Sequence, residues 1–317
     1  MKIFITGGTG NIGQYVTLAA IENGHEAVVL SRNPEKFPSL AKKATLVKGT
    51  ITDYDQLPDY IKGCNAVIHI ALGWGDEPVS MLMNDTAATV NLLEISEKVG
   101  VENFIYTSST AAMGHMRNGM DETVVNLPID LYGSTKSASE AYVLGFSKYY
   151  TASGQESLFG KHKNVSMKRN IIRPGYTYSN PPYPDGSTEP DARFRNIAKA
   201  VVNNQPVSLT KYDGTQFISA KEIAQLYIKL LESGKDGEIY LALGNMFTSW
   251  EKIAQMALEL FPGSKSEIAL NDLGWGADPY LYCVKKMEKD FGLSFDSQKD
   301  LCEHVKWCIE EAAKQKG

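Results

Sequence analysis

The sequence predicts an α/β fold: a Rossmann-like doubly wound parallel sheet, followed by a smaller C-terminal α/β region that binds substrate. Three observations predict it. Strand-like apolar runs alternate with helix-length segments, a glycine-rich turn follows the first run, and 317 residues suffice to bury a large core. Such alternation is typical of βαβ units, whose strands pair in parallel. In chain order, we expect strands at residues 2–6, 26–31, 44–48, 65–70 and 103–108.

The second half of the chain is expected to complete the sheet and then change character. A further strand is predicted at 165–172, after a helix that begins near Tyr132 and a polar stretch at 151–163 that we interpret as an exposed loop or insertion. The sheet should hold six or seven strands. Because residues 180–186 are rich in turn formers, we predict a Rossmann nucleotide-binding domain at 1–175, to which part of the later chain returns, and a mainly substrate-binding region at 176–317.

Composition and charge exclude several classes of protein. Apolar residues make up 43% and charged residues 22%, as in globular proteins, and no apolar run is long enough to span a membrane. The first residues lack the pattern of a secretory signal, so we expect a cytoplasmic location. A net charge of −5 with dispersed lysines and arginines argues against nucleic acid as a partner. The cysteines are scattered and predict reduced thiols and no metal site: Cys64, Cys283, Cys302 and Cys308.

A glycine-rich segment, Thr6-Gly7-Gly8-Thr9-Gly10-Asn11-Ile12-Gly13, joins the first strand to a helix that should run to about Asn23. In this context glycines let backbone N–H groups approach a pyrophosphate, and the helix N-terminus adds partial positive charge. A tight turn without ligand is the alternative. The residues expected to contact a dinucleotide here are Gly7, Gly10, Asn11, Ile12 and Gly13.

The end of the second strand bears on the choice between NAD and NADP. An acidic residue there would bind the free 2′-hydroxyl of NAD, but the sequence has Ser31 and Arg32. The guanidinium of Arg32 suits a 2′-phosphate and Ser31 adds a donor, although an arginine here can also simply face solvent. We therefore expect NADP(H), with NAD as the alternative.

The segment Tyr132-Gly133-Ser134-Thr135-Lys136 carries a phenol and an ammonium one helical turn apart. An adjacent ammonium and an oxidised nicotinamide both favour the phenolate, so Tyr132 can remove a proton as hydride leaves a carbinol carbon, or donate one in reverse. Ser109, which follows the strand ending in Thr107-Ser108, can orient the same substrate oxygen. We predict Ser109, Tyr132 and Lys136 as catalytic residues.

These motifs, together with Arg173-Pro174-Gly175, resemble the extended short-chain dehydrogenase/reductases, the NAD-dependent epimerase/dehydratase family. The resemblance runs through nearly the whole chain and is strongest over residues 1–180. It implies that Tyr132 is the acid/base, that Lys136 also holds the nicotinamide ribose and that Ser109 positions the reacting oxygen. The cofactor contacts expected beyond the glycine loop and Ser31-Arg32 are Asp53, Ile70, Ala71, Thr107, Tyr132, Lys136 and Arg173, the last near the carboxamide.

The sequence also departs from the family's pattern. Where nucleotide-sugar enzymes carry an arginine for the diphosphate, residues 214–220 hold none, and Arg193 and Arg195 are better read as a solvated helix face than as substitutes. Thr110-Ala111-Ala112 replaces the acidic pair of the sugar dehydratases, so dehydration is not expected. Thr50 stands where an aspartate is frequent, leaving Asp53 as the nearest carboxylate. Asp85, in turn, stands where the family commonly has asparagine, which is a further departure from the pattern.

Other polar and aromatic residues are candidates for the substrate pocket. Trp74 and Trp275 can form an aromatic wall, but packing of two loops is the preferred interpretation. The residues proposed to contact substrate are Ser109, Thr110, His115 and Arg195.

Three functions are compatible with these features. The first is an NAD(P)-dependent oxidoreductase acting reversibly on a small carbonyl compound or secondary alcohol. The second is a nucleotide-sugar 4-epimerase with tightly bound NAD, and the third, from a different class, is a non-catalytic NADP-sensing regulator. By resemblance we also expect a homodimer formed through helices at about 81–99 and 132–149, the first bearing a stripe of Leu82, Thr86, Val90 and Leu93 that can equally pack on the sheet.

Overall fold

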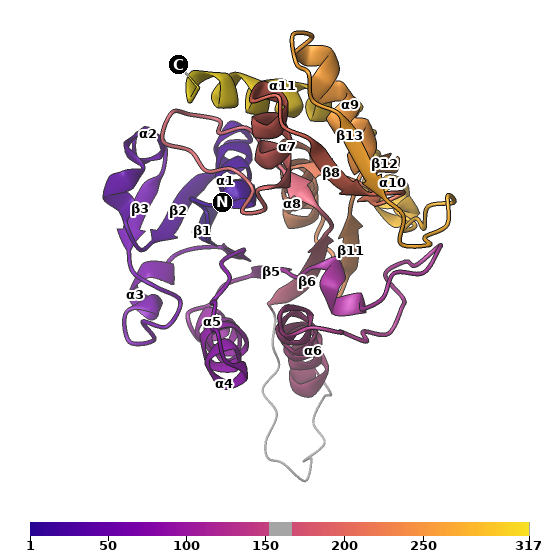
Figure 1. The fold of residues 1–317 in the computed structure, drawn as a ribbon. Helices are drawn as coiled ribbons and strands as arrows, with labels where there is room; N and C mark the ends of the chain where they lie inside the picture. Colours follow the sequence, from indigo (N-terminus) through magenta and orange to yellow (C-terminus); the bar gives the residue numbers. More distant parts are fainter. Residues whose placement is uncertain (152–166, 317) are drawn as a thin grey trace.

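The computed structural model describes residues 1–151 and 167–316, and within them seven strands form one parallel sheet in the order β11-β6-β5-β4-β1-β2-β3 (Figure 1). The predicted Rossmann-like fold is confirmed. The strands are β1 (Lys2–Thr6), β2 (Glu26–Ser31), β3 (Thr45–Lys48), β4 (Ala66–His69), β5 (Asn103–Thr107), β6 (Lys168–Pro174) and β11 (Ile239–Ala242). Five of the strand positions predicted from sequence agree within one residue at each end. β6 begins at Lys168 and continues through Pro174, and the predicted insertion at 151–163 lies outside the described residues apart from Thr151.

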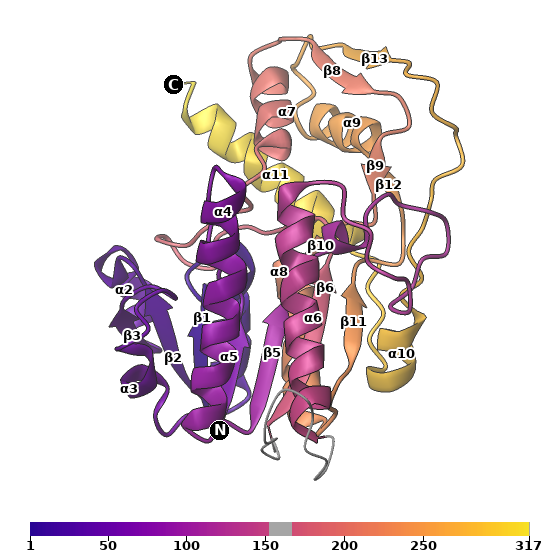
Figure 2. The same ribbon diagram turned by 90° about the horizontal axis from the view of Figure 1, so that it is seen from below.

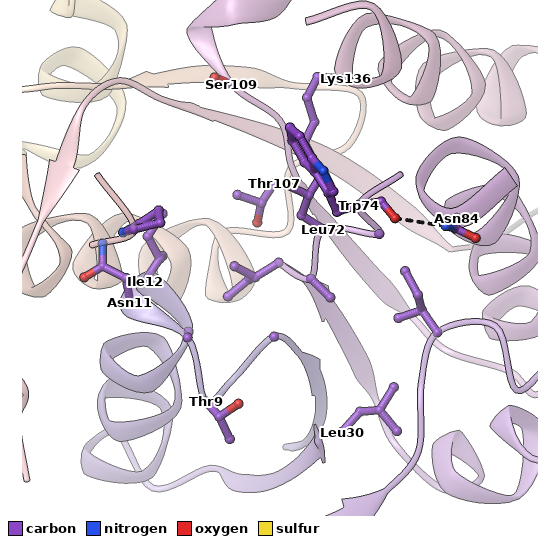
Figure 3. Close-up of a pocket in the computed structure, with 18 of the residues that line it drawn as sticks. Thr9, Asn11, Ile12, Leu30, Leu72, Trp74, Asn84, Thr107, Ser109 and Lys136 are labelled. Atoms are coloured by element: carbon purple, nitrogen blue, oxygen red, sulfur yellow. Dashed lines mark hydrogen bonds between the residues drawn. The ribbon is translucent and has the colours of Figure 1, made fainter. Parts of the chain in front are cut away.

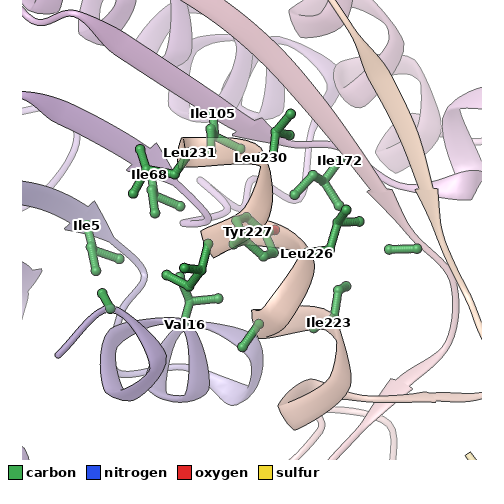
Figure 4. Close-up of a cluster of buried hydrophobic side chains, with 14 of the residues drawn as sticks. Ile5, Val16, Ile68, Ile105, Ile172, Ile223, Leu226, Tyr227, Leu230 and Leu231 are labelled. Atoms are coloured by element: carbon green, nitrogen blue, oxygen red, sulfur yellow. The ribbon is translucent and has the colours of Figure 1, made fainter. Parts of the chain in front are cut away.

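Helices cover both faces of the sheet because the strands are apolar on both sides (Figure 1). One face is covered by α1 (Asn11–Glu22) and α8 (Ala220–Glu232). Figure 4 shows Val16 of α1 and Leu226 and Tyr227 of α8 among the isoleucines of the strands. The other face is covered by α3 (Leu57–Ile61), α5 (Ala88–Lys98) and α6 (Leu131–Thr151). Both cores hold the strand ends, and hence the residues that follow them, in fixed positions.

The helix before β5 is interrupted by a π-helical turn. α4 (Pro78–Met81) continues through the turn η2 (Leu82–Ala87) into α5, as one rod beside α6 (Figure 2). A π-helical turn holds more residues than an α-helical one, so side chains beyond it change face. The prediction that Leu82, Thr86 and Leu93 share one face of a helix is therefore wrong, because Leu82 is exposed whereas Thr86 and Leu93 are buried.

Segments after residue 175 return to the sheet, where β11 pairs with β6 and α8 packs on α1. The rest forms a separate cluster, in which α7 (Arg193–Val202), α9 (Trp250–Leu260) and α11 (Gln298–Lys314) bury Phe194 and Trp250 (Figure 2). The smaller elements are η1 (Pro34–Lys36), α2 (Pro38–Ala41), η3 (Thr110–Met113), β7 (Thr177–Tyr178), β8 (Val207–Thr210), β9 (Gly214–Thr215), β10 (Ile218–Ser219), β12 (Thr248–Ser249), β13 (Ile268–Asn271) and α10 (Lys285–Phe291). Among the described residues, no helix is long and apolar enough to cross a bilayer, and no group of metal-binding side chains occurs.

A buried ion pair fixes α6 against β6. The guanidinium of Arg173 donates to Glu140 through Nε at 2.8 Å and Nη2 at 2.7 Å, and both side chains are almost fully buried. Asn126 completes the cluster, accepting from Arg173 at 3.0 Å and donating to Glu140 at 2.7 Å. Because Glu140 lies one helical turn after Lys136, this pair also fixes the helix that carries Tyr132 and Lys136.

Replacing Glu140 with alanine should destabilise the protein by about 3 to 5 kcal/mol, because the charge of Arg173 would remain buried without a partner. Urea unfolding measures the change. Glu94→Ala is the matched control, since Glu94 forms an exposed ion pair with Lys98 on α5, worth less than about 1 kcal/mol. A loss for Glu140→Ala no larger than that of the control would show that the buried pair does not hold α6 in place.

Candidate active site

A cavity of about 700 Å³ opens at the carboxyl ends of β1 and β4, where the strand order reverses. Open α/β sheets bind ligands at such a point. Figure 3 shows Thr107, Ser109 and Lys136 on one side of the cavity and Thr9 and Leu30 on another. Most residues predicted from sequence line it together: Gly7, Gly10, Asn11, Ile12, Gly13, Ser31, Arg32, Ile70, Ala71, Thr107, Ser109, Tyr132 and Lys136.

The glycine loop has the shape that a pyrophosphate requires. Gly7 has a φ of +70°, and a Cβ placed there would lie 2.6 Å from the backbone nitrogen of Ala71. A Cβ at Gly13 would lie 2.0 Å from the Gly7 carbonyl oxygen. Gly10 caps α1 without a side-chain hydrogen bond, so the first-turn N–H groups stay available to an anion. The loop therefore fits the dinucleotide that the sequence predicts.

The side chain of Asn11 is committed to the protein, so Asn11 faces the cavity mainly through its backbone. Its Nδ2 donates to the Thr177 carbonyl at 3.2 Å, and its Oδ1 accepts from the Ser179 hydroxyl. Gln14, one turn later on α1, bonds to Ser187 through both side-chain amide atoms. These contacts dock the segment at 177–190 over α1, where it contributes Pro190 to the cavity wall.

At the far end of the cavity, Ser31 is buried at the end of β2 and Arg32 is exposed. No ion pair of Arg32 occurs within the part of the chain that the structure describes. Thr50, Ile51 and Thr52 line the same end. Asp53 lies behind them, where it accepts from the backbone N–H of Thr50 at 2.7 Å and from its hydroxyl at 3.0 Å. Arg32 is therefore the cation available to a phosphate at this end.

Tyr132 and Lys136 lie one turn apart at the start of α6, as their spacing predicts, with the ammonium 5.9 Å from the centroid of the phenol ring. Ser109 caps η3 by accepting from the N–H of Ala111 at 3.1 Å. Burial raises the pKa of Tyr132, and a hydrogen bond with Ser109 acts in the opposite direction. Without the charge of a bound oxidised nicotinamide, the phenol of Tyr132 therefore keeps its proton at neutral pH.

A buried carboxylate lies beside the ammonium of Lys136. Asp85, which is fully buried, places Oδ2 3.6 Å from Nζ of Lys136. Burial lowers the pKa of Lys136, and Asp85 raises it. Asp85 also raises the pKa of Tyr132. The sequence marks Asp85 as a departure from the family pattern but predicts no role for it.

Five residues predicted to contact cofactor or substrate lie outside the cavity lining. The guanidinium of Arg173 is held by Glu140, although Pro174 and Gly175 do line the cavity. The ion pair of Arg195 with the buried Glu189 likewise engages its guanidinium. Thr110 hydrogen-bonds to Tyr282, and His115 is exposed. With Asp53 behind Thr50, the roles of all five stay predictions.

The cavity also contains residues that sequence reasoning did not assign. Leu72 and Trp74 follow β4 and line the wall near Lys136 (Figure 3). Trp74 is 61% exposed and Trp275 50% exposed, so the expected packing of these two indoles is wrong, and only Trp74 reaches the cavity. Asn84 donates to the Trp74 carbonyl at 2.9 Å. Ser108 lines the cavity with a buried hydroxyl that has no partner among the described residues. The positions of Leu72 and Trp74 shortly after β4, and of Ser108 directly after β5, were the signal that could have identified them.

Known proteins are similar to this chain in sequence or in fold. The chain is 23% identical to cinnamoyl-CoA reductase 1 of Petunia hybrida, over 98% of the chain and 91% of that protein. It is 30% identical to a 3-beta-hydroxysteroid dehydrogenase of Mycolicibacterium neoaurum, over 45% of the chain and 43% of that protein. Its fold is similar to UDP-glucuronic acid 4-epimerase of Bacillus cereus in complex with NAD, at a TM-score of 0.80, 19% identity and 99% coverage of both chains.

UDP-glucose 4-epimerase of Thermotoga maritima gives a TM-score of 0.78 at 20% identity, with both chains fully covered. At these identities the solved structures show a shared fold and leave the substrate open. The sequence profile of the NAD dependent epimerase/dehydratase family matches residues 3–242, which include the glycine loop, Ser109, Tyr132, Lys136 and β11. This chain therefore belongs to the NAD-dependent epimerase/dehydratase family.

Proposed function

We propose that the chain is an oxidoreductase that uses NADP(H), transfers hydride reversibly between the nicotinamide and the carbon of a small carbonyl compound or secondary alcohol, and uses Tyr132 as the acid/base. This proposal rests on the set of residues that line the cavity described above. The cavity joins Ser109, Tyr132 and Lys136 to the glycine loop, and it ends at Ser31 and Arg32.

The cations around the cavity support a substrate without a diphosphate. In the described part of the chain, the lysine and arginine side chains that line the cavity are Arg32, at the adenosine end, and Lys136, beside Asp85. Arg193 is a possible substitute for the missing diphosphate arginine. Its guanidinium, however, donates to Asp191 at 2.9 Å and lies 4.4 Å from the Trp250 ring centroid. A sugar nucleotide would therefore lack the charge-assisted contacts that usually hold its phosphates. This favours a carbonyl reductase over a nucleotide-sugar 4-epimerase.

The chain's own residues suffice for the proton step. Bound NADPH supplies the hydride. Tyr132 holds a proton that burial keeps on the phenol, and it donates this proton to the substrate oxygen as the carbonyl is reduced. Ser109 orients the same oxygen, and Lys136 holds the nicotinamide ribose. Leu72 and the exposed indole of Trp74 provide an apolar wall for the body of the substrate.

The nucleotide itself is the first test. Freshly purified protein is denatured, any released nucleotide is identified by mass and absorbance, and the emptied protein is titrated with NADPH and with NADH. We expect a site that binds NADPH at least about tenfold more tightly than NADH. NAD retained at near-full occupancy would contradict the assignment of Arg32 and favour the epimerase. Tight NADPH binding with no turnover on any carbonyl or alcohol would favour a cofactor-sensing regulator.

We also propose that the chain forms a homodimer through the rod of α4, η2 and α5 together with α6, which lie side by side on one face of the sheet (Figure 2). Exposed large apolar side chains occur on both elements, namely Val79, Leu82 and Met83 on the rod and Tyr142 on α6, and this supports association through them. Light scattering of the purified protein tests the proposal, and a monomer at micromolar concentration would contradict it.

A further inference from the structure

Asp85 is a buried carboxylate whose charge the proposed reaction does not itself require. Its Oδ1 accepts from the N–H of Gly73 at 3.0 Å, in the loop that follows β4. Its Oδ2 receives no hydrogen bond among the described residues and lies 3.6 Å from the Lys136 ammonium. A fully buried carboxylate is costly unless a cation faces it, so the position of this charge calls for a physical reason.

A chain of hydrogen bonds fixes the backbone of Asp85. The Thr89 hydroxyl donates to the Asp85 carbonyl at 2.8 Å, so its oxygen must accept from His69 Nε2 at 2.9 Å. His69 Nδ1 then accepts from the Thr6 hydroxyl at 2.6 Å. Thr6 immediately precedes Gly7. The π-helical turn that carries Asp85 is thus tied to the base of the glycine loop.

Other titratable groups around Lys136 do not replace Asp85. Burial, with a smaller contribution from the charge of Lys136, lowers the pKa of His69 to about 3, so His69 is neutral. Glu140 is held by Arg173. Tyr106 packs its ring 5.2 Å from the ammonium, and burial raises its pKa, as it does that of Tyr132. Among these groups, Asp85 is therefore the anion that faces Lys136 and is not engaged by another cation.

We propose that Asp85 is a positioning residue whose carboxylate is the counter-ion of Lys136, holding the ammonium charged and linking it through Gly73 to the loop that carries Leu72 and Trp74. This proposal deepens the proposed function and rests on it. The asparagine that the family commonly has at this position would keep a hydrogen bond to Gly73 but lose the charge. With Asp85 the Lys136 site is electrically balanced, and Tyr132 remains a proton donor over a wider pH range.

The test is competitive acetylation of the full, cofactor-free chain with acetic anhydride across the pH range. The Lys136 peptide is quantified by mass spectrometry against exposed Lys62 as internal reference. Because only the neutral amine reacts, the midpoint of each curve gives the pH at which that lysine loses its charge. Lys136 is almost fully buried but lines the cavity, which is the route by which the small reagent can approach its amine.

We expect Asp85→Asn to move the Lys136 midpoint down by at least about one pH unit, since an opposite charge at this range is worth about one to three units. Asp85→Glu, which keeps the charge, should stay closer to the wild-type curve. Asp76→Asn is the matched control: it removes one negative charge from the same loop, where Asp76 accepts from the exposed Trp74 indole, and should leave the midpoint unchanged. Identical curves for wild type and Asp85→Asn would overturn the proposal.

If Asp85→Asn does not fold, the wild-type curve decides. A midpoint like that of unpaired buried lysines, about 5 to 6, would show that no counter-ion acts on Lys136, and a midpoint well above it supports the pair. The labelling needs neither substrate nor nucleotide. A chain that oxidises no NADPH with any carbonyl would therefore defeat the proposed function without changing this result.

Discussion

Tyr132→Phe is expected to lower kcat for carbonyl reduction by about 10² to 10⁴, because the variant keeps the ring and loses the proton donor. The Kd for NADPH should change little, since the nucleotide contacts remain. For the wild type, reduction requires the protonated phenol, so the rate should be lost as pH rises through the pKa of Tyr132. Burial raises that pKa, which places the loss on the alkaline side. Steady-state rates from pH 6 to 10.5 measure both effects.

The control for this variant is Tyr142→Phe. Tyr142 lies on the same helix, is exposed and does not line the cavity, so the loss of its hydroxyl should leave kcat unchanged. A Tyr132→Phe variant that retains more than about a tenth of wild-type kcat would show that another group supplies the proton.

Arg32→Ala should weaken NADPH binding by about tenfold to a hundredfold, the worth of charge-assisted hydrogen bonds to a phosphate of about 1.5 to 3 kcal/mol. NADH, which carries no 2′-phosphate, should bind the variant about as well as the wild type. Titration of the emptied protein with each nucleotide, followed by fluorescence, measures the two Kd values. The variant should therefore lose its preference for NADPH over NADH and still bind both nucleotides.

Lys36→Ala provides the comparison for Arg32→Ala. Lys36 is an exposed cation of η1 close to β2 in the chain, but it does not line the cavity. Its removal changes the net charge of the protein by the same amount as Arg32→Ala and should leave the Kd values for NADPH and NADH unchanged. If Arg32→Ala weakened NADPH and NADH by the same factor, Arg32 would be acting on a part of the nucleotide that both share.

The parts of this fold that the sequence predicted are those encoded by short-range patterns. The strands follow from apolar runs, and the phosphate loop follows from glycines between a strand and a helix. Tyr132 and Lys136 were predicted to share a helix face because a spacing of four residues requires it. These features depend on neighbouring residues, so a single sequence contains them.

The rest depends on contacts between distant segments. Arg173 looked available to a cofactor, but its partner Glu140 lies 33 residues earlier in the chain. Asp85 faces Lys136 from a π-helical turn, and no residue pattern in 82–87 predicts that turn. Trp74 was expected to pack in a loop, yet it lines the cavity, and the Gly73 before it lies against the backbone of Asn84 from a later segment.

The most direct test of the proposed oxidoreductase activity is whether the chain consumes free NADPH in stoichiometric amounts with a carbonyl substrate. Emptied protein is mixed with NADPH and a panel of aliphatic and aromatic ketones and aldehydes, and in parallel with UDP-sugars and NAD, while nucleotide and product are quantified. We expect one alcohol formed per NADPH oxidised for at least one apolar carbonyl, and no change in the UDP-sugars. Interconversion of UDP-sugars without net change in the nucleotide would contradict it.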